Sequence, residues 1–341
     1  MPVNASSNPP RVGFAGVGWI GLNRLRAIAA AGNAQIVGIL DTSQDAAQVA
    51  VRCIEANAPG ARVVRDFDEL LAQGLDGIVI ATPSGLHARQ AKAALESGHA
   101  VFCQKPLART AGEAAKVIAA ARTSDRLLSV DLCYRTVAGV PRLVELARSG
   151  ELGDIYAVDL VFHNAYGPDK SWFYDLQQSG GGCVMDLGIH LLDLALLVLD
   201  YPRVCAVSSQ LHAAGVLLNK PVSQLEDHAF AEVQFSSGTT ARMACSWRLS
   251  AGQAAVIEAA FYGTKGAAIL RNIDGSFYNF AVEHCVGTQR RAIAADDEQW
   301  GGRAANAWIT ELSRGARFDE RTSRLYDLSV LIDAIYGRQS G

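Results

Sequence analysis

The chain has 341 residues, half of them apolar, and a formal net charge of −3. Because it has no cluster of Lys and Arg, it offers no basis for binding nucleic acid or an anionic membrane. A chain of this length exceeds what one hydrophobic core usually organises, so two domains are expected.

The N-terminal part of the sequence predicts a nucleotide-binding type of fold. Residues 1–10 lack the pattern of a signal peptide and are predicted to be a disordered lead-in. Residues 11–131 alternate short apolar runs such as RVGFAG and QIVGILD with amphipathic runs such as LNRLRAIAAAG. This alternation of strands and helices predicts a doubly wound parallel sheet with helices on both faces, as in a Rossmann domain.

A different pattern follows in residues 132–318. After a helical run, VPRLVELARSG, come strand-like runs such as IYAVDLVFHNA and HAFAEVQFSSGTTARMACSWRL, with a hairpin-like break at Gly238. They predict an open-faced, largely antiparallel sheet. Because a broad apolar face in water favours association, we expect a homodimer or homotetramer formed through that face.

The seven cysteines contain no CxxC pair. An odd number of cysteines in apolar contexts is typical of reduced, buried thiols in a cytoplasmic protein. The longest aliphatic run, residues 187–199, is interrupted by His190 and Asp193. Neither a membrane span nor a metal site is therefore predicted.

The segment GFAGVGWIG has the GxGxxG spacing at Gly16, Gly18 and Gly21, after an apolar strand and at the start of a helix. These glycines allow a tight turn, close approach of a pyrophosphate, and close helix packing, respectively. Asp41, twenty residues after Gly21, can accept hydrogen bonds from both ribose hydroxyls and disfavours a 2′-phosphate. NAD is therefore expected rather than NADP. The alternative to a dinucleotide site is that the glycines only form a turn and that Asp41 only caps a helix.

The fifth predicted strand, AVFCQ, ends at Gln104 and is followed by Lys105 and Pro106. Since the carboxyl ends of parallel strands face the ligand crevice, Lys105 is expected to point toward the nicotinamide end of the cofactor. An ammonium there would stabilise an alkoxide that develops on a substrate oxygen. The alternative is a solvated lysine, which is the commoner state of this residue.

The stretch GGGCVMDLGIHLLDLA is apolar apart from Asp186, His190 and Asp193. At about 100° per residue these three lie within about 60° of one another on a helix, so they share one stripe. Ionisable groups inside a buried helix need partners, which predicts a ligand or polar groups opposite them. The alternative for Asp186 and His190 is a structural ion pair at i,i+4. Asp193 is expected to be a structural partner.

These stretches resemble the glucose-fructose oxidoreductase and inositol dehydrogenase (Gfo/Idh/MocA) family over nearly the whole chain. The resemblance is carried by GFAGVGWIG, ATPSGLHARQAKAALESGHAVFCQKPLARTAGEA, RSGELGDI and SGGGCVMDLGIHLLD. It implies a Rossmann domain, then an open-faced sheet domain, with the last helix, in residues 319–341, packing back on the first domain. It also implies a catalytic Lys105 and an Asp186–His190 pair that face nicotinamide and substrate.

One departure concerns position 104, where the family motif Glu-Lys-Pro becomes Gln-Lys-Pro. Gln104 removes a negative charge beside Lys105 but can still bond a ribose hydroxyl of the nicotinamide half. His87 matches a recurrent family histidine near the cofactor, although packing or a helix start is the commoner role of such a histidine. The predicted cofactor-binding residues are Gly16, Val17, Gly18, Trp19, Ile20, Gly21, Asp41, Thr42, Ala81, Thr82, Pro83, His87, Gln104 and Lys105.

The expected function is NAD-dependent oxidation of a secondary alcohol of a sugar, sugar acid or cyclic polyol. His190 would be the base and Lys105 would polarise the reacting oxygen. Asp186 would orient the imidazole of His190 or bind a substrate hydroxyl. Two alternatives stay open: a glycosidase that retains NAD and oxidises its substrate transiently, and a non-catalytic NAD-sensing protein. The resemblance adds further residues to the substrate pocket, each of which could instead stabilise the fold: Arg135, His163, Asn164 and Trp172.

Overall fold

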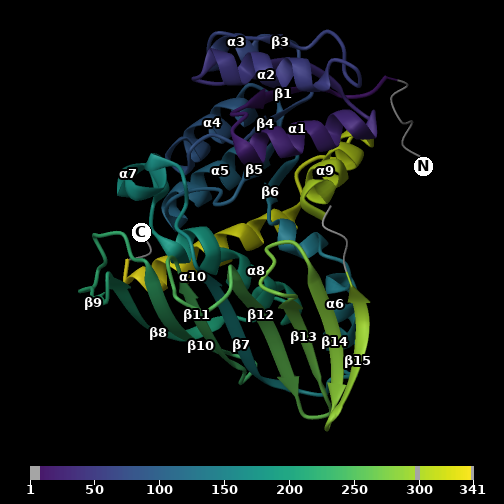
Figure 1. The fold of residues 1–341 in the computed structure, drawn as a ribbon. Coiled ribbons are helices and arrows are strands. Elements are labelled where there is room, and N and C mark those ends of the chain that lie inside the picture. Colours follow the sequence, from purple (N-terminus) through teal and green to yellow (C-terminus); the bar gives the residue numbers. More distant parts are fainter. Residues whose placement is uncertain (1–7, 296–299, 339–341) are drawn as a thin grey trace. The chain divides into compact units, whose positions relative to one another are not determined.

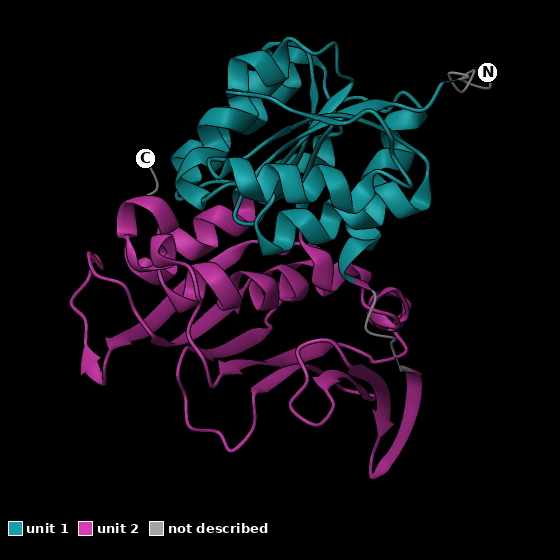
Figure 2. Ribbon diagram, turned by 45° about the horizontal axis from the view of Figure 1, so that its top comes forward, with its two compact units in different colours: residues 1–131, 301–326 teal, residues 132–300, 327–341 magenta. Residues whose placement is uncertain are grey.

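The computed structural model describes residues 8–295 and 300–338, so most of the predicted lead-in lies outside the described residues. The chain divides into two compact units, coloured separately in Figure 2. Unit 1 comprises Met1–Asp131 and Gly301–Tyr326, and unit 2 comprises Leu132–Trp300 and Asp327–Gly341. The boundary between residues 131 and 132 coincides with the predicted one.

Unit 1 contains a six-stranded sheet in the order β3-β2-β1-β4-β5-β6, with every neighbouring pair parallel. This is the doubly wound order, in which the chain reverses direction across the sheet between β1 and β4. The predicted Rossmann fold is confirmed. Its strands are β1 (Arg11–Ala15), β2 (Gln35–Leu40), β3 (Arg62–Val63), β4 (Gly77–Ile80), β5 (Ala100–Gln104) and β6 (Leu128–Asp131).

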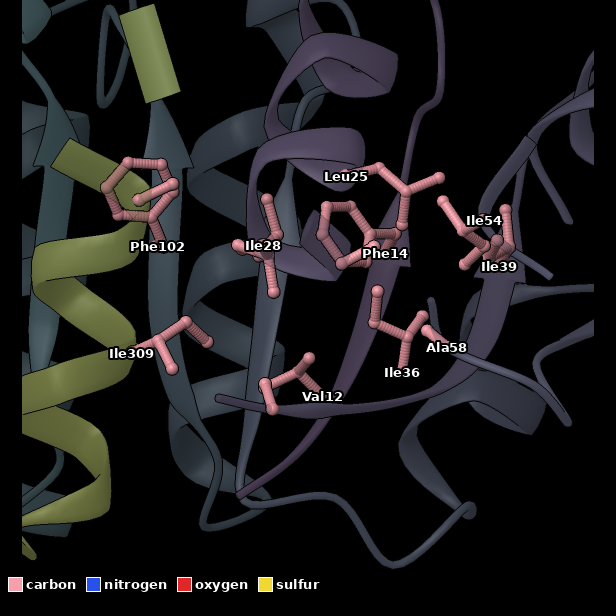
Figure 3. Close-up of a cluster of buried hydrophobic side chains, with 14 of the residues drawn as sticks. Val12, Phe14, Leu25, Ile28, Ile36, Ile39, Ile54, Ala58, Phe102 and Ile309 are labelled. Atoms are coloured by element: carbon pink, nitrogen blue, oxygen red, sulfur yellow. The ribbon is translucent and has the colours of Figure 1, made fainter. Parts of the chain in front are cut away.

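Apolar helix faces build the core of unit 1 against this sheet. Figure 3 shows one cluster, in which Phe14 of β1 and Phe102 of β5 are buried together with Leu25 and Ile28 of α1. Because all neighbouring strands of this sheet are parallel, their carboxyl ends lie along one edge. The helices after the strands are α1 (Trp19–Ala31), α2 (Gln44–Ile54), α3 (Phe67–Leu71), α4 (Ser84–Glu96) and α5 (Ala111–Ser124).

The last two long helices divide differently from the sequence expectation. The prediction that residues 132–318 form the sheet domain is wrong for α9 (Arg303–Ser313), because its Trp308 and Ile309 are buried in the core of unit 1, with the Trp308 ring centroid 5.7 Å from that of Phe102. Of α10 (Arg324–Tyr336), only the first residues group with unit 1, where Leu325 packs; the remainder belongs to unit 2. Burial of individual apolar side chains decides these memberships.

Unit 2 contains a nine-stranded sheet in the order β15-β14-β13-β12-β7-β11-β10-β8-β9 (Figure 1). The pairings are antiparallel except for β7 with β11, so the largely antiparallel sheet is confirmed. Gly238, with φ +86°, turns the chain between β10 and β11. The strands are β7 (Ile155–Asn164), β8 (Val204–Ala213), β9 (Val216–Leu217), β10 (His228–Phe235), β11 (Thr240–Ser246), β12 (Ala255–Gly263), β13 (Ala267–Asn272), β14 (Phe280–Val286) and β15 (Gln289–Ala295).

Helices cover one face of this sheet, where α8 (Ile189–Val198) packs on β7, β11 and β12 and α6 (Val140–Arg148) packs on β13. Side chains on the opposite face are more accessible, for example Phe230 of β10, which is 50% exposed. We call this second surface the open face. Short helices complete the unit: η1 (Cys133–Thr136), η2 (Ser171–Tyr174), α7 (Leu176–Ser179) and the π-helical turn η3 (Val184–Gly188).

The helical stretch Leu176–Val198 is long and apolar enough to cross a membrane, but 89% of its most apolar window is buried inside the protein, as in a core helix. All seven cysteines are free thiols. The expectation that they are buried is wrong for Cys53 and Cys205, which are exposed because they lie on outward-facing positions of α2 and β8.

Candidate active site

The glycine-rich turn of unit 1 joins β1 to α1. Gly16 has φ +89°, and a Cβ there would lie 2.5 Å from the backbone of Ala81. A Cβ on Gly21 would lie 2.2 Å from the Gly16 carbonyl oxygen, whereas a Cβ on Gly18 would meet nothing within 4 Å. The first and third glycines are therefore required by packing, and the space beside Gly18 is open.

Asp41 follows β2 and is tied to this turn. Its Oδ2 accepts the Val17 N–H at 2.8 Å and its Oδ1 accepts the Ser43 N–H at 2.9 Å. Ser43, rather than Asp41, caps α2, because its Oγ accepts the Ala46 N–H at 3.2 Å. A carboxylate has about four lone-pair positions, so these two bonds leave acceptor capacity for ribose hydroxyls.

His87 lies on α4 with a ring that is 1% exposed. Its Nδ1 lies 2.6 Å from the Pro106 carbonyl oxygen and its Nε2 lies 2.7 Å from the Thr82 carbonyl oxygen. Burial lowers the pKa of His87, the nearby Lys105 charge lowers it further, and the two carbonyls oppose this shift. The ring joins the loop after β4 to the turn after β5, which is the packing role that the sequence left open.

Lys105 stands directly after β5, at the carboxyl edge of the sheet, and is partly exposed. Its peptide bond to Pro106 is cis. The preceding side chain, Gln104, is buried and donates from Nε2 to Asp131 Oδ2 at the end of β6. The Lys105 backbone is thus anchored on its N-terminal side by Gln104 and on its C-terminal side by His87.

Asp186 lies within the π-helical turn η3, and His190 lies in the first turn of α8. The spacing of about 100° per residue that we assumed does not hold through residues 184–188, because a π-turn bonds i to i+5. Asp186 Oδ2 accepts a hydrogen bond from Trp247 Nε1 at 3.0 Å. The His190 ring, 7% exposed, lies 4.7 Å from the Tyr134 ring.

A buried carboxylate holds the start of this helical segment. Glu226 Oε2 accepts the Gly182 N–H at 3.0 Å, and Oε1 accepts the Val184 N–H at 2.9 Å and the Tyr336 hydroxyl at 2.7 Å. A Cβ on Gly182 would lie 1.9 Å from the Glu226 carbonyl oxygen. Burial raises the pKa of Glu226, while these hydrogen bonds favour its ionised form. The run of glycines therefore makes room for partners that arrive from elsewhere in the chain.

Asp193 is paired rather than directed at a ligand. Arg135 Nε donates to Asp193 Oδ2 at 2.7 Å, Arg135 Nη2 donates to Oδ1, and Nη2 also donates to the Tyr201 hydroxyl at 2.9 Å. Asp193 has the structural role expected of it. The guanidinium of Arg135 is committed to the same pair, which favours its fold-stabilising alternative.

His163 and Asn164 are consecutive on β7 and so point to opposite faces of the sheet. Phe162, on the helix-covered face, packs 6.0 Å from Tyr134, whereas His163 bonds Ser246 Oγ at 2.8 Å on the open face. The sheet therefore separates His163 from His190, so the proposed site does not include His163.

The aromatic residue Trp172 is linked to Asp186 through neighbouring rings. Trp172 stacks on Phe173 with centroids 3.8 Å apart, and Phe173 meets the edge of Trp247 at 6.4 Å. Trp247 in turn donates to Asp186. Tyr174, 41% exposed, lies beside the same indole at 6.0 Å.

The residues of unit 1 fit NAD on structural grounds. The N-terminus of α1 has no side-chain cap, and the space beside Gly18 is open, so its N–H groups are suited to phosphate oxygens. Ionised Asp41 next to the turn suits a ribose diol better than a 2′-phosphate. Among residues 8–295 and 300–338, no three His, Cys, Asp or Glu side chains group so that they could hold a metal ion.

Sequence reasoning missed four residues that contact the Asp186–His190 segment: Tyr134, Glu226, Trp247 and Tyr336. Trp247 lies near the end of the predicted strand-like run HAFAEVQFSSGTTARMACSWRL, and Tyr134 lies close to the predicted domain boundary at residue 132, so both positions carried a usable signal. Glu226 and Tyr336 gave none, because a single Glu in a loop and a single Tyr in an apolar helix are common in any chain.

Two family models match the chain. Residues 10–132 match the model described as "Oxidoreductase family, NAD-binding Rossmann fold", and residues 140–269 match the "GFO/IDH/MocA C-terminal domain". Each match falls within the unit whose fold it describes, apart from the single residue 132.

Curated relatives and solved structures agree with these models. The chain is 26% identical over 278 residues to D-glucoside 3-dehydrogenase of Escherichia coli, covering 78% of each chain. It is 31% identical over 193 residues to inositol 2-dehydrogenase of Rhodococcus erythropolis, covering 56% of this chain and 53% of the relative. Levoglucosan dehydrogenase in complex with NADH shares the fold, with a TM-score of 0.81, 20% identity and 96% of each chain covered. The protein is therefore an oxidoreductase of the Gfo/Idh/MocA family, with an NAD-binding Rossmann domain at its N-terminus.

Proposed function

We propose that this protein is an NAD-dependent dehydrogenase that oxidises a secondary alcohol of a sugar, sugar acid or cyclic polyol. The family models on both halves of the chain support an oxidoreductase. Relatives named for glucosides and inositol support a polyhydroxylated substrate.

The proposed reaction needs a base for the hydroxyl proton, because a hydride can leave carbon only as that oxygen loses its proton. Bound NAD supplies the hydride acceptor. His190 takes the hydroxyl proton, since an imidazole has an ordinary pKa of about 6.5. Lys105 stabilises the developing charge on the same oxygen, and Asp186 orients a substrate hydroxyl or the imidazole.

The observation that carries the proposal is the placement of Asp186 and His190. Both residues lie in an apolar helical segment. Asp186 accepts a hydrogen bond from Trp247, and the His190 ring lies against the ring of Tyr134. A π-turn at this position is a costly departure from the α-helix and is frequent at functional sites. An exposed ion pair would need none of these supports.

The remaining site residues divide by unit. The glycine turn, Asp41 and residues 81–83 are proposed to hold NAD in preference to NADP, and Trp172 and Asn164 to contact the substrate. Arg135 supports the site indirectly through Asp193. We also propose a cytoplasmic protein that forms a homodimer or homotetramer through the open face, which sedimentation would test: a strict monomer contradicts the assembly.

The test of the proposed function is net turnover of NAD. Protein, NAD and a panel of free sugars, glycosides, inositols and sugar acids are mixed, and the absorbance of NADH is followed. We expect a rise with at least one compound, at a rate that saturates with its concentration.

Two other outcomes would favour the alternatives. Release of an aglycone from a glycoside, without net NADH, would indicate a glycosidase that retains NAD. Binding of NAD without turnover of any compound would indicate an NAD-sensing protein. Either result contradicts the dehydrogenase proposal.

A further inference from the structure

A buried ionic network in unit 1 adjoins Lys105, and the proposed reaction makes no use of it. Arg24 of α1 donates from Nε to Asp131 Oδ2 at 2.6 Å, and Gln104 Nε2 donates to the same oxygen. Arg24, Gln104 and Asp131 are 3%, 7% and 0% exposed. Gln104 and Asp131 face each other because the last residues of β5 and β6 are paired in register.

Asp131 carries the negative charge of this network. A guanidinium is always protonated, and a buried one needs an anion beside it. The charge of Asp131 also reaches β5, since burial and then Asp131 raise the pKa of the Cys103 thiol. The guanidinium of Arg24 from α1 and the thiol of Cys103 from β5 thus both face Asp131.

The network explains why position 104 holds an amide. An ionised carboxylate only accepts hydrogen bonds, so a glutamate at 104 would place oxygen against Asp131 oxygen. Two carboxylates at that separation cannot both stay ionised. Gln104 avoids the conflict by donating. The negative charge is therefore not lost beside Lys105 but stands one strand away, on Asp131.

The side chain that receives this charge precedes Lys105 directly in the chain. Gln104 anchors the N-terminal side of the Lys105 backbone through Asp131, and the His87 ring meets Pro106 on the other side at 2.6 Å. A change at Asp131 consequently reaches Lys105 through one hydrogen bond and one residue of backbone.

We propose that Asp131 is a positioning residue for Lys105, acting through the Gln104 amide and paired with Arg24. The functional consequence rests on the proposed role of Lys105.

A charge exchange by mutation tests the proposal. The variants are Gln104→Glu, Asp131→Asn and the double variant with both changes, with Gln35→Glu as control. Gln35 is exposed at the start of β2 and bonds Arg11 at 3.1 Å, so a carboxylate there adds the same charge to the same sheet without a buried acid beside it. The chain has six lysines, so ¹³C-methylation of the lysines gives few NMR resonances, and Lys105→Arg assigns that of Lys105.

The Lys105 resonance should move in both single variants, return in the double variant and stay in place in Gln35→Glu. With an active protein, kcat of Gln104→Glu at pH 8 should fall about tenfold, because the carboxyl group at 104 is then forced against the Asp131 carboxylate and no longer anchors the backbone of Lys105 as the amide does. The double variant should regain kcat to within about threefold. The dissociation constant of NAD should change by less than about threefold throughout, since the glycine turn and Asp41 are untouched and the Gln104 Nε2 group is bonded to Asp131.

Three results would overturn the proposal: a Lys105 resonance that moves in neither single variant, one that does not return in the double variant, or NAD binding that weakens in parallel with kcat. If Asp131→Asn does not fold, Gln104→Glu and the double variant still decide, since the latter keeps an acid beside Arg24. The NMR measurement needs no turnover, so a protein that yields no NADH would refute the proposed function and leave this test standing.

Discussion

The candidate site residues of unit 1 and those of unit 2 are held in place in different ways. In unit 1, the glycine turn, Asp41 and Lys105 each follow a strand of one parallel sheet, and the regular alternation of strands and helices sets their place. In unit 2, Asp186 and His190 lie on a helical segment whose position depends on side chains from distant parts of the chain, such as Glu226 and Trp247.

This difference has a consequence for substitution. A site that is defined by the backbone tolerates most changes beside it as long as the sheet forms, and it loses function where a side chain meets the ligand or positions one that does. A side-chain-defined site fails when remote partners are removed, because nothing else fixes its register. Substitutions in unit 1 should therefore mainly change NAD binding and turnover. Substitutions in unit 2 that remove a remote partner should also lower the stability of the protein.

The largest expected effect is that of Lys105→Met. Removing the ammonium takes away stabilisation of the developing alkoxide, so kcat should fall about 10³-fold or more. NAD binding, followed by quenching of tryptophan fluorescence, should change by less than about threefold, because the cofactor is held by the glycine turn and Asp41. Turnover at the wild-type rate would remove Lys105 from the mechanism.

The glycines of the two units give a matched comparison. A Cβ on Gly182 would lie 1.9 Å from the Glu226 carbonyl oxygen, so Gly182→Ala should destabilise the protein by about 3 kcal/mol. Gly18→Ala meets no atom within 4 Å and has φ −59°, so its stability should stay within about 0.5 kcal/mol while NAD binds more weakly. Urea unfolding and NAD titration measure both. Equal loss of stability in the two variants would contradict the comparison.

The same contrast explains what the sequence could predict. The sheet order of unit 1, the glycine turn and the place of Lys105 follow from local periodicity and from the rule that parallel strands share a carboxyl edge. The π-turn at Asp186 and the separation of His163 from His190 do not, because they depend on which distant side chains meet. The membership of α9 was also misjudged, since only the burial of Trp308 and Ile309 decides it.

Tyr336→Phe removes the hydroxyl that bonds Glu226, the carboxylate at the start of the Asp186–His190 segment, and leaves the aromatic ring in place. The hydroxyl donates to buried Glu226 at 2.7 Å, and its loss should cost about 1–3 kcal/mol, because a charged acceptor loses a donor. We expect kcat to fall by about threefold to tenfold, with NAD binding unchanged. The control is Tyr156→Phe, whose side chain is 58% exposed. Wild-type stability for Tyr336→Phe would show that Glu226 is held without it.

The smallest expected effect concerns the open face of unit 2, where His212, His228 and His163 lie in one row with Ser246. Burial, and then the charge of His212, lowers the pKa of His228, and the carboxylate of Asp227 opposes this shift. The pKa of His163 is lowered by burial and by His228.

A histidine with a lowered pKa in the folded state makes stability fall in acid. Below the ordinary histidine pKa of about 6.5, the unfolded chain binds a proton that folded His228 does not, so stability is lost as pH falls from there toward the folded pKa. His228→Gln should reduce the difference between the urea midpoints at pH 7.5 and pH 5.5, since it removes that proton and the repulsion on its neighbours. Ser208→Ala, an exposed change on the neighbouring strand β8, should leave the difference unchanged. If His228→Gln behaves like Ser208→Ala, the row of imidazoles does not govern the acid response.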